Sequence, residues 1–280
     1  MTITVGVDLG TGAVKTALFN VEEGKTEWLA RRNDKIRQRD PFKLAESAFD
    51  SVLKDAGLSA GDVHYVATTG DGESIQFSTG HFYSMTTHAR GAIFLEPEAR
   101  SLLDVGALHG RAVKMDERGK VLGYRMTSQC ASGSGQFLEN IARYLGVAQS
   151  EIGELSQQAD DPETVSTICA VLAETDVINM VSRGISAPNI IKGIHLAMAG
   201  RLAKLLRVIK ATDGVTLVTG GLAMDEGLIV SLQENIEQQK IKVITRSHPD
   251  SPYAGAIGAA LWGAFRYEKL AAQGRFAKAS

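Results

Sequence analysis

One segment near the N-terminus combines the residue types that bind a phosphate and its metal ion. Asp8 ends an apolar run and is followed by Gly10, Thr11 and Gly12, with Lys15 three residues beyond. Glycine permits positive φ and lets backbone N–H groups approach a phosphate, while Thr11 adds a hydroxyl and Lys15 a positive charge. A carboxylate at a strand end can hold a hydrated Mg²⁺. The segment therefore fits a phosphate loop or, equally well, an ordinary Asp-Gly hairpin turn.

Two later segments repeat parts of this chemistry. Asp104 and Gly106 offer a second carboxylate and glycine turn, and two such loops facing one another are a more specific signal than one. Gly220 and Gly221 directly follow an expected strand at residues 215–219, where absent side chains would let an adenosine lie against the backbone. A diglycine alone is more often a strand-to-helix turn.

The chain's two cysteines both stand at the threshold of an expected helix. Cys130 precedes the glycine-rich turn Gly133, Ser134 and Gly135, and Cys169 immediately precedes a second helix. A helix N-terminus stabilises negative charge, so both positions favour a thiolate. A [4Fe-4S] cluster normally takes four thiolates, so this chain offers half a site that a dimer would complete. Two inert buried thiols are the ordinary alternative.

The elements expected around these residues form two similar halves. Strands at residues 3–9, 13–21 and 26–31 make an antiparallel meander, before a helix opened by Asp40-Pro41 and a buried strand at residues 63–68. Leu102 to Gly106 matches Val7 to Gly10, and Ala112-Val113-Lys114 echoes Ala13-Val14-Lys15, which indicates an internal duplication. Further helices are expected at residues 133–145, 170–182, 189–209, 226–238 and 253–268, and further strands at 215–219 and 241–245.

This order of strands and helices predicts an α/β fold in which a mostly parallel sheet extends from each meander. We expect the first domain to span residues 1–94 together with a returning C-terminal helix at 253–280. The second domain is then expected to span residues 95–252.

Composition restricts the classes of partner. The formal net charge is -2, from 30 basic and 32 acidic side chains, so no broad basic surface for nucleic acid or an anionic membrane is expected. No apolar run is long enough to span a bilayer, and two cysteines are too few for a secreted disulfide framework. We therefore expect a cytoplasmic protein that binds small molecules and other proteins.

In chain order, the segments around Asp8, Asp104 and Gly220 resemble the phosphate-1, phosphate-2 and adenosine motifs of the actin, Hsp70 and sugar-kinase ATPase superfamily. The resemblance implies two duplicated, ribonuclease H-like domains with a nucleotide cleft between them. A P-loop fold is disfavoured because no Gly-x-x-x-x-Gly-Lys-Ser/Thr segment is present, and a Rossmann fold because its glycine spacing is missing.

The cysteine segments narrow the resemblance. Cys130-Ala-Ser-Gly-Ser-Gly-Gln-Phe-Leu-Glu and Ile168-Cys-Ala-Val-Leu-Ala-Glu are similar to the BadF/BadG/BcrA/BcrD ATPase family, which holds 2-hydroxyacyl-CoA dehydratase activators and benzoyl-CoA reductase subunits. Residues 104–112 and 126–130 look most like the D-subunit branch of class I benzoyl-CoA reductase. The family implies that Cys130 and Cys169 ligate a [4Fe-4S] cluster shared with a second subunit.

The same resemblance implies that hydrolysis of ATP with Mg²⁺ drives an electron from reduced ferredoxin through that cluster to subunits that reduce benzoyl-CoA. The implied partners are these benzoyl-CoA-reducing subunits, the ferredoxin, and either a homologous ATPase subunit related by a pseudo-twofold axis or a second copy of this chain. The implied catalytic residues are Asp8 and Asp104. The implied cofactor-binding residues are Gly10, Thr11, Gly12, Lys15, Gly106, Gly133, Ser134, Gly135, Gly220 and Gly221.

One position departs from the family's pattern. The homodimeric activators usually read Asp-Ile-Gly-Gly-Gln-Asp at phosphate-2, where the glutamine can orient the attacking water, and this chain carries Leu108 there. Asp104 or another group must then orient the water, or hydrolysis is slower. Three alternatives stay open: a dehydratase activator, a metabolite kinase with Asp104 as general base, and a nucleotide-dependent regulator without turnover.

Overall fold

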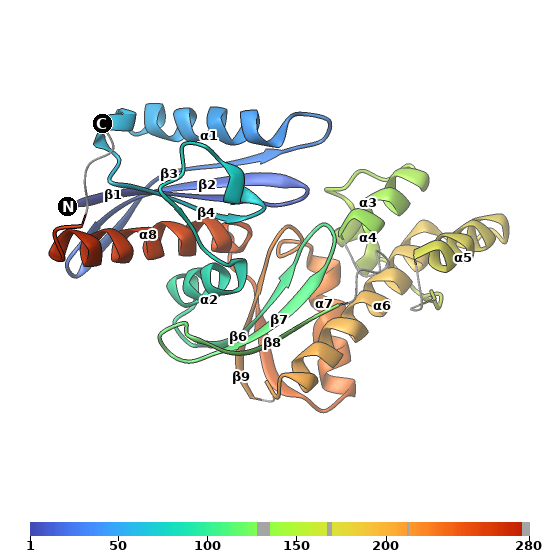
Figure 1. Cartoon of the computed structure of the whole chain (residues 1–280). Coiled ribbons are helices and arrows are strands. Elements are labelled where there is room, and N and C mark those ends of the chain that lie inside the picture. The colour runs from blue at the N-terminus through green and yellow to red at the C-terminus, as the bar shows by residue number, and fades with distance from the viewer. Residues whose placement is uncertain (128–134, 167–169, 212, 276–280) are drawn as a thin grey trace. The chain divides into compact units, whose positions relative to one another are not determined.

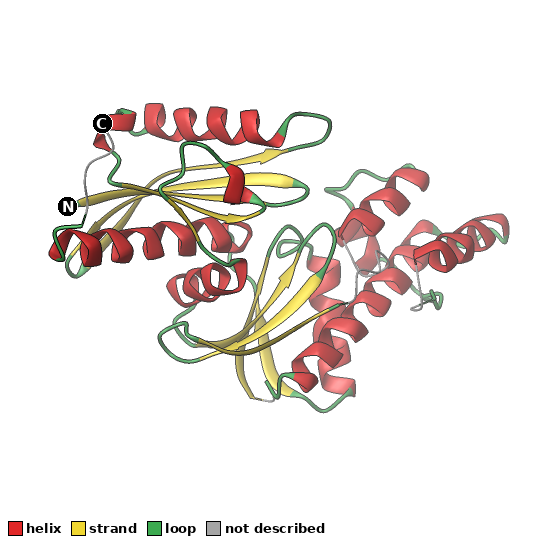
Figure 2. Ribbon diagram, viewed as in Figure 1, coloured by secondary structure: helices red, strands yellow, loops and turns green. Residues whose placement is uncertain are grey.

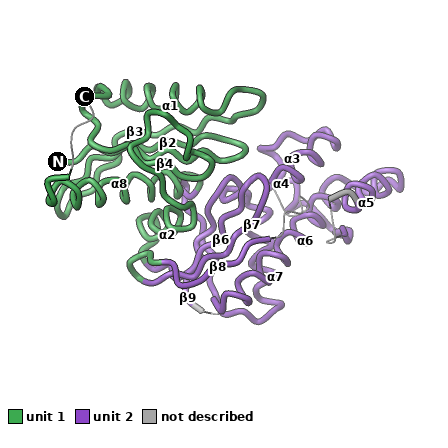
Figure 3. The backbone as a smooth tube through the Cα atoms, in the orientation of Figure 1, with its two compact units in different colours: residues 1–97, 117–120, 252–280 green, residues 98–116, 121–251 purple. Residues whose placement is uncertain are grey.

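The computed structural model describes residues 1–127, 135–166, 170–211 and 213–275. The chain divides into two compact units, each assembled from separate stretches of sequence (Figure 3). Unit 1 contains Met1–Pro97, Glu117–Lys120 and Pro252–Ser280, and unit 2 contains Glu98–Asp116 and Val121–Ser251. Each unit is built on its own five-stranded sheet.

The sheet of unit 1 has the strand order β3-β2-β1-β4-β5. Strands β1, β2 and β3 pair antiparallel as the predicted meander, while β4 runs parallel to β1 and β5 runs parallel to β4. The strands are β1 (Thr2–Leu9), β2 (Ala13–Glu22), β3 (Lys25–Lys35), β4 (Tyr65–Gly70) and β5 (Gly80–His81).

The sheet of unit 2 repeats this topology with the order β10-β9-β6-β7-β8. Its first three strands again form an antiparallel meander, and β9 and β10 extend it with parallel pairing. The strands are β6 (Ala99–Val105), β7 (Gly110–Met115), β8 (Val121–Met126), β9 (Asp213–Thr219) and β10 (Lys242–Arg246). The predicted α/β fold and its internal duplication are therefore confirmed.

Helices cover both faces of the first sheet (Figures 1 and 2). Helix α1 (Pro41–Asp55) packs on the face that carries Ile3, Val5 and Val7, and α8 (Ala254–Ala272) packs on the opposite face. The start of α1 follows its sequence signals, because the Asp40 side chain accepts the N–H of Phe42 at 2.8 Å. The remaining elements of unit 1 are α2 (Ser84–Leu95) and the 3₁₀ turns η1 (Ala60–Asp62) and η2 (Gly72–Ser74).

Helix α8 lies unusually close to the first sheet, and a glycine makes this approach feasible. A Cβ added to Gly6 of β1 would lie 1.9 Å from the carbonyl oxygen of Ala256, so only glycine fits beneath the helix. Ala17, Phe19 and Ile257 close the same interface. Helix α8 therefore completes a unit whose first strand begins at Thr2.

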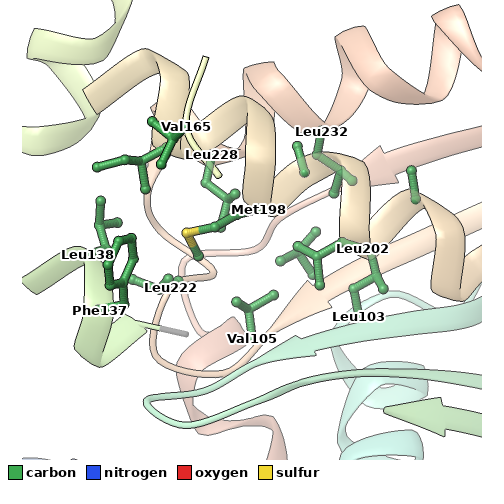
Figure 4. Packing of buried hydrophobic residues seen from close by; sticks show 14 of the residues in the cluster. Leu103, Val105, Phe137, Leu138, Val165, Met198, Leu202, Leu222, Leu228 and Leu232 are labelled. Carbon is green, nitrogen blue, oxygen red and sulfur yellow. The ribbon is translucent and has the colours of Figure 1, made fainter. Parts of the chain in front are cut away.

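The core of unit 2 packs helices against the sheet through buried hydrophobic side chains (Figure 4). Leu103 and Val105 of β6 belong to the same cluster as Phe137, Met198 and other helical residues. The helices are α3 (Gly135–Tyr144), α4 (Ile152–Gln157), α5 (Ala170–Ser182), α6 (Ala187–Val208) and α7 (Glu226–Gln238), and η4 (Ser251–Tyr253) follows β10. Within the described ranges, no helix has both the length and the apolar character needed to cross a membrane.

Some element boundaries differ from the expected ones. Helix α6 begins at Ala187 rather than Asn189. Pro188 is tolerated in the first turn because a backbone N–H there would have no partner within the helix, so its absence costs no hydrogen bond. Helix α2, strand β5 and helix α4 were not expected from the sequence. The expected start of a helix at Gly133 lies outside the described residues.

Candidate functional site

The β1–β2 hairpin of unit 1 brings together the five residues of the first predicted loop. Asp8 of β1 lies directly opposite Lys15 of β2, and the two residues are only 6% and 8% exposed. The Gly10 N–H donates to the Ala13 carbonyl at 3.0 Å, which closes the turn and leaves Thr11 and Gly12 exposed. Burying a carboxylate and an ammonium costs free energy that a hairpin turn alone does not require. This favours a binding role for the loop.

Three residues that the sequence reasoning missed surround the Asp8 carboxylate. His88 of α2 places Nε2 3.8 Å from Asp8 Oδ2, and both side chains are buried. Gly70 ends β4 with φ of +69°, and a Cβ there would lie 3.0 Å from Asp8 Oδ1. A Cβ on Gly255 would lie 2.5 Å from Asp8 Oδ2 and 2.8 Å from His88 Nε2. The Asp8 side chain is therefore fixed from three elements that are distant in sequence.

Unit 2 repeats this arrangement with one change of residue type. Asp104 of β6 lies opposite Arg111 of β7, seven residues later, as Lys15 follows Asp8 by seven. The Arg111 guanidinium pairs with Asp104 and donates from Nε to Oδ2 at 2.9 Å. The predicted match between Lys114 and Lys15 is wrong, because Lys114 lies opposite Ser101 and its ammonium binds the Lys210 carbonyl at 2.9 Å.

The two glycines after β9 differ in what surrounds them. Gly220 has φ of +89°, and a Cβ there would lie 2.5 Å from Asp104 Oδ1 and 2.6 Å from the Val105 carbonyl oxygen. A Cβ on Gly221 would meet no atom within 4 Å. Gly220 therefore lets the backbone pack directly against the Asp104 carboxylate. The space beside Gly221 is not occupied by other described atoms. Thr219-Gly220 corresponds to Thr69-Gly70 of unit 1. The repeated Thr-Gly pair at the end of a buried strand was therefore the signal that could have identified Gly70.

Comparison with known proteins settles the family. The model of the BadF/BadG/BcrA/BcrD ATPase family matches residues 5–263. The chain belongs to this ATPase family. Among its relatives, the D-subunit of benzoyl-CoA reductase from Thauera aromatica is 74% identical over 275 residues, which cover 98% of each chain. This family membership makes ATP the expected nucleotide of the protein.

Two solved structures in the family have the same fold. Component A of (R)-2-hydroxyglutaryl-CoA dehydratase from Acidaminococcus fermentans aligns with a TM-score of 0.86 and 28% identity, covering 97% of this chain and all of that one. The activator of 2-hydroxyisocaproyl-CoA dehydratase from Clostridium difficile, solved with bound ADPNP, aligns with a TM-score of 0.84 and 26% identity, with both chains fully covered. Both support the duplicated fold predicted for this ATPase.

The start of α3 in this family member is held by the loop that follows β6. The N–H of Gly135 donates to the Gly106 carbonyl at 3.0 Å, and the N–H of Gln136 donates to the Ala107 carbonyl at 2.9 Å. A Cβ on Gly135 would lie 3.2 Å from the Gly106 oxygen and 3.3 Å from Leu222 Cγ. The loop after β6, the loop after β9 and the beginning of α3 are therefore interlocked within unit 2.

The two candidate ligands of the iron–sulfur cluster, Cys130 and Cys169, can be located only by their sequence separation from α3 and α5. Cys130, Gly133, Ser134 and Cys169 lie outside the described residues. Cys130 precedes the first residue of α3 by five positions, and Cys169 directly precedes α5. Within the described part of the chain, no three His, Cys, Asp or Glu side chains gather as a metal site. The donor set fits a cluster only as half of its four thiolates.

A buried polar network lies at the far end of the loop that contains Gly220. His195 of α6 is fully buried, with Nδ1 2.8 Å from Ser156 Oγ and Nε2 3.3 Å from Asp225 Oδ2. Asp225 also accepts the Leu228 N–H at 3.0 Å and so caps α7. Burial would raise the pKa of Asp225, but His195 and the backbone N–H groups outweigh it and hold this pKa below its usual value. The network anchors the loop to α4 and α6.

Proposed function

We propose that this chain is the ATP-hydrolysing, electron-activating subunit of an ATP-dependent benzoyl-CoA reductase that works in the cytoplasm with reduced ferredoxin as donor. The observation that carries the proposal is the 74% identity to the D-subunit of benzoyl-CoA reductase from Thauera aromatica across 98% of each chain. Identity at this level over nearly full length is far above the 28% shared with the dehydratase component whose fold matches. A dehydratase activator is therefore the weaker candidate.

The two carboxylate loops support ATP binding and hydrolysis. In unit 1, Asp8 would hold water molecules of a Mg²⁺ ion, while Thr11 and Lys15 would contact phosphate oxygens. In unit 2, Asp104 and Arg111 form the corresponding pair, and the Arg111 guanidinium donates from two nitrogens to Asp104 Oδ2 where unit 1 has an ammonium. The open space at Gly221 suits a nucleotide that lies against the backbone.

Cys130 and Cys169 would hold half of a [4Fe-4S] cluster, and the other two thiolates would come from a homologous subunit or a second copy of this chain. When bound, the cluster would supply one-electron transfer at low potential. Gly135 and Gln136 connect this chemistry to ATP, because their N–H groups bind the carbonyls of the phosphate loop that contains Gly106. A shift of that loop would therefore move the start of α3, five residues after Cys130.

The test is the metal content of cysteine variants in the assembled complex. Cys130→Ser and Cys169→Ser should each lose the iron assigned to the subunit interface and its electron paramagnetic resonance signal, in protein purified without oxygen. ATP affinity should stay within about threefold of the parent, since neither change touches the carboxylate loops. Ser132→Ala is the matched control, because it changes a hydroxyl residue two positions from Cys130 in sequence and removes no thiolate. Retention of the signal in both serine variants would refute the electron-transfer role.

A further inference from the structure

ATP hydrolysis needs a group that orients the attacking water, and the family's usual glutamine is replaced here by Leu108. In the reaction, the water oxygen bonds to the γ-phosphorus while the bond from that phosphorus to the β,γ-bridging oxygen breaks. ADP leaves, and the water's proton must pass to an acceptor before it reaches phosphate or solvent. Leu108 is 41% exposed and has no polar atom with which to orient this water. The inference that follows rests on the proposed ATPase function and names the acceptor.

Asp71 lies at the end of β4, next to the phosphate loop of unit 1. In the parallel register of β1 and β4, Asp8 faces Thr69 and Leu9 faces Gly70. The next residue is Asp71, whose N–H donates to the Leu9 carbonyl at 2.8 Å. The carboxyl ends of adjacent parallel strands meet at one edge of a sheet. Asp71 is therefore held beside the loop that begins at Asp8.

The duplication gives this position independent support. In unit 1, Thr69 of β4 lies opposite Asp8 and is followed by Gly70 and Asp71. In unit 2, Thr219 of β9 lies opposite Asp104 and is followed by Gly220 and Gly221. Both middle residues are glycines with positive φ packed on the adjacent carboxylate. The third residue is Gly221 in unit 2, which has open space beside it, and Asp71 in unit 1, which carries a carboxylate. A position that leaves room for a ligand in one unit thus carries an acid in the other.

The Asp71 backbone is constrained, and its carboxylate is not used to cap the turn that it precedes. Asp71 is the residue before η2, yet its side chain makes no capping hydrogen bond. The backbone on both sides is constrained, because Gly70 packs on the Leu9 carbonyl and a Cβ on buried Gly72 would lie 3.1 Å from the Thr68 Cβ. Asp71 itself is exposed. A fixed backbone and a solvent-facing carboxylate are what water positioning requires.

We propose that Asp71 is a catalytic residue of this ATPase, accepting a hydrogen bond from the attacking water and taking its proton as the new P–O bond forms. Asp104 is less suited because its carboxylate is engaged by Arg111. Asp8 is less suited because it is buried against His88 and is assigned to the waters of Mg²⁺. Asp71 thus supplies the hydrogen-bond and proton acceptor that the aliphatic side chain of Leu108 cannot provide.

The experiment compares Asp71→Ala, Asp71→Glu and the control Glu73→Gln in the assembled complex. Glu73 is an exposed acid two residues away on η2, so it reports on loss of local charge alone. Asp71→Ala should lower kcat for ATP by about 100-fold or more, with ATP affinity within about threefold of the parent. Asp71→Glu should recover at least tenfold of that loss, and Glu73→Gln should stay within about twofold of the parent.

The alternative outcomes separate this proposal from the proposed function. If the parent hydrolyses ATP and Asp71→Ala keeps kcat within threefold of it, Asp71 is not catalytic while the ATPase assignment stands. A loss of ATP affinity as large as the loss of kcat would also overturn the proposal, because it indicates binding rather than water positioning. A parent complex that neither binds nor hydrolyses ATP would overturn both.

Discussion

Replacing Gly220 by alanine should damage unit 2, while a change at its neighbour Gly221 should not. Alanine at φ of +89° carries a backbone cost of about 1–2 kcal/mol. Its Cβ would also lie 2.5 Å from Asp104 Oδ1 and 2.6 Å from the Val105 carbonyl, and such overpacking typically costs about 1–3 kcal/mol. The expected loss of unfolding free energy is therefore about 2–5 kcal/mol, a large part of a total of about 5–15 kcal/mol.

On the proposed function, the same change should also reduce ATP turnover, because the Asp104 carboxylate of the proposed phosphate site must move to admit the new methyl group. A displacement of about 1 Å at a catalytic group can cost about 100-fold in rate. Gly221→Val is the informative companion, since its Cβ meets no atom within 4 Å. Its stability should stay within about 0.5 kcal/mol of the parent. ATP affinity should nevertheless fall by about tenfold or more if the nucleotide occupies that space.

The assays are urea unfolding followed by circular dichroism and ATP titration by calorimetry, each on the parent and both variants. The two variants should differ in the property that they lose. Gly220→Ala should lose stability, whereas Gly221→Val should mainly lose affinity for ATP. Equal stability of Gly220→Ala and the parent would show that the packing around Asp104 relaxes freely, and the structural reasoning would be wrong. Unchanged affinity in Gly221→Val would remove that glycine from the nucleotide site.

Two further predictions concern the water-orienting position and the buried network. Leu108→Gln, which restores the family's amide, should raise ATP turnover of the assembled complex, and a flat or lower turnover in folded protein would contradict the interpretation of this departure. Asp225→Asn should lower stability at neutral pH by about 1–3 kcal/mol, because it removes the charge facing His195. The folded-state pKa of Asp225 lies below the ordinary 3.8, so its contribution is present above that pH and is lost as pH falls through the lower folded value. Acid unfolding curves below about pH 4 should accordingly be shallower for Asp225→Asn than for the parent, and parallel curves would exclude this role.

The sequence predicted most of the architecture because its patterns are local. The meander, the capped helix after Asp40 and the strands before each glycine turn all follow from periodicity and turn residues within a few positions. Helix α2 escaped prediction because its threonines and Gly91 give weak helical propensity. It is held by packing, since a Cβ on Gly91 would lie 2.0 Å from the Ala254 carbonyl oxygen.

The candidate site was predictable only where its residues are neighbours in sequence. Asp8 to Lys15 form one hairpin, so their grouping follows from the glycine turn alone. His88 and Gly255 reach the Asp8 carboxylate from α2 and α8, and no pattern near Asp8 announces them. Arg111 was overlooked because Lys114 was matched to Lys15 on residue identity alone. The strand register instead places Arg111 opposite Asp104.

The long stretch of sequence between β4 and α8 affects how unit 1 folds during synthesis on the ribosome. Strand β4 is complete at Gly70, but α8, which covers the sheet face that carries Ala17 and Phe19, ends only at Ala272. At about 5–20 residues per second, those 202 positions take about 10–40 s to translate. During this interval Ala17 and Phe19 lack the partners Ile257 and Ala260 that bury them. Unit 1 is therefore the half that nascent-chain chaperones must protect, and a ribosome stalled before residue 252 should release an aggregation-prone fragment.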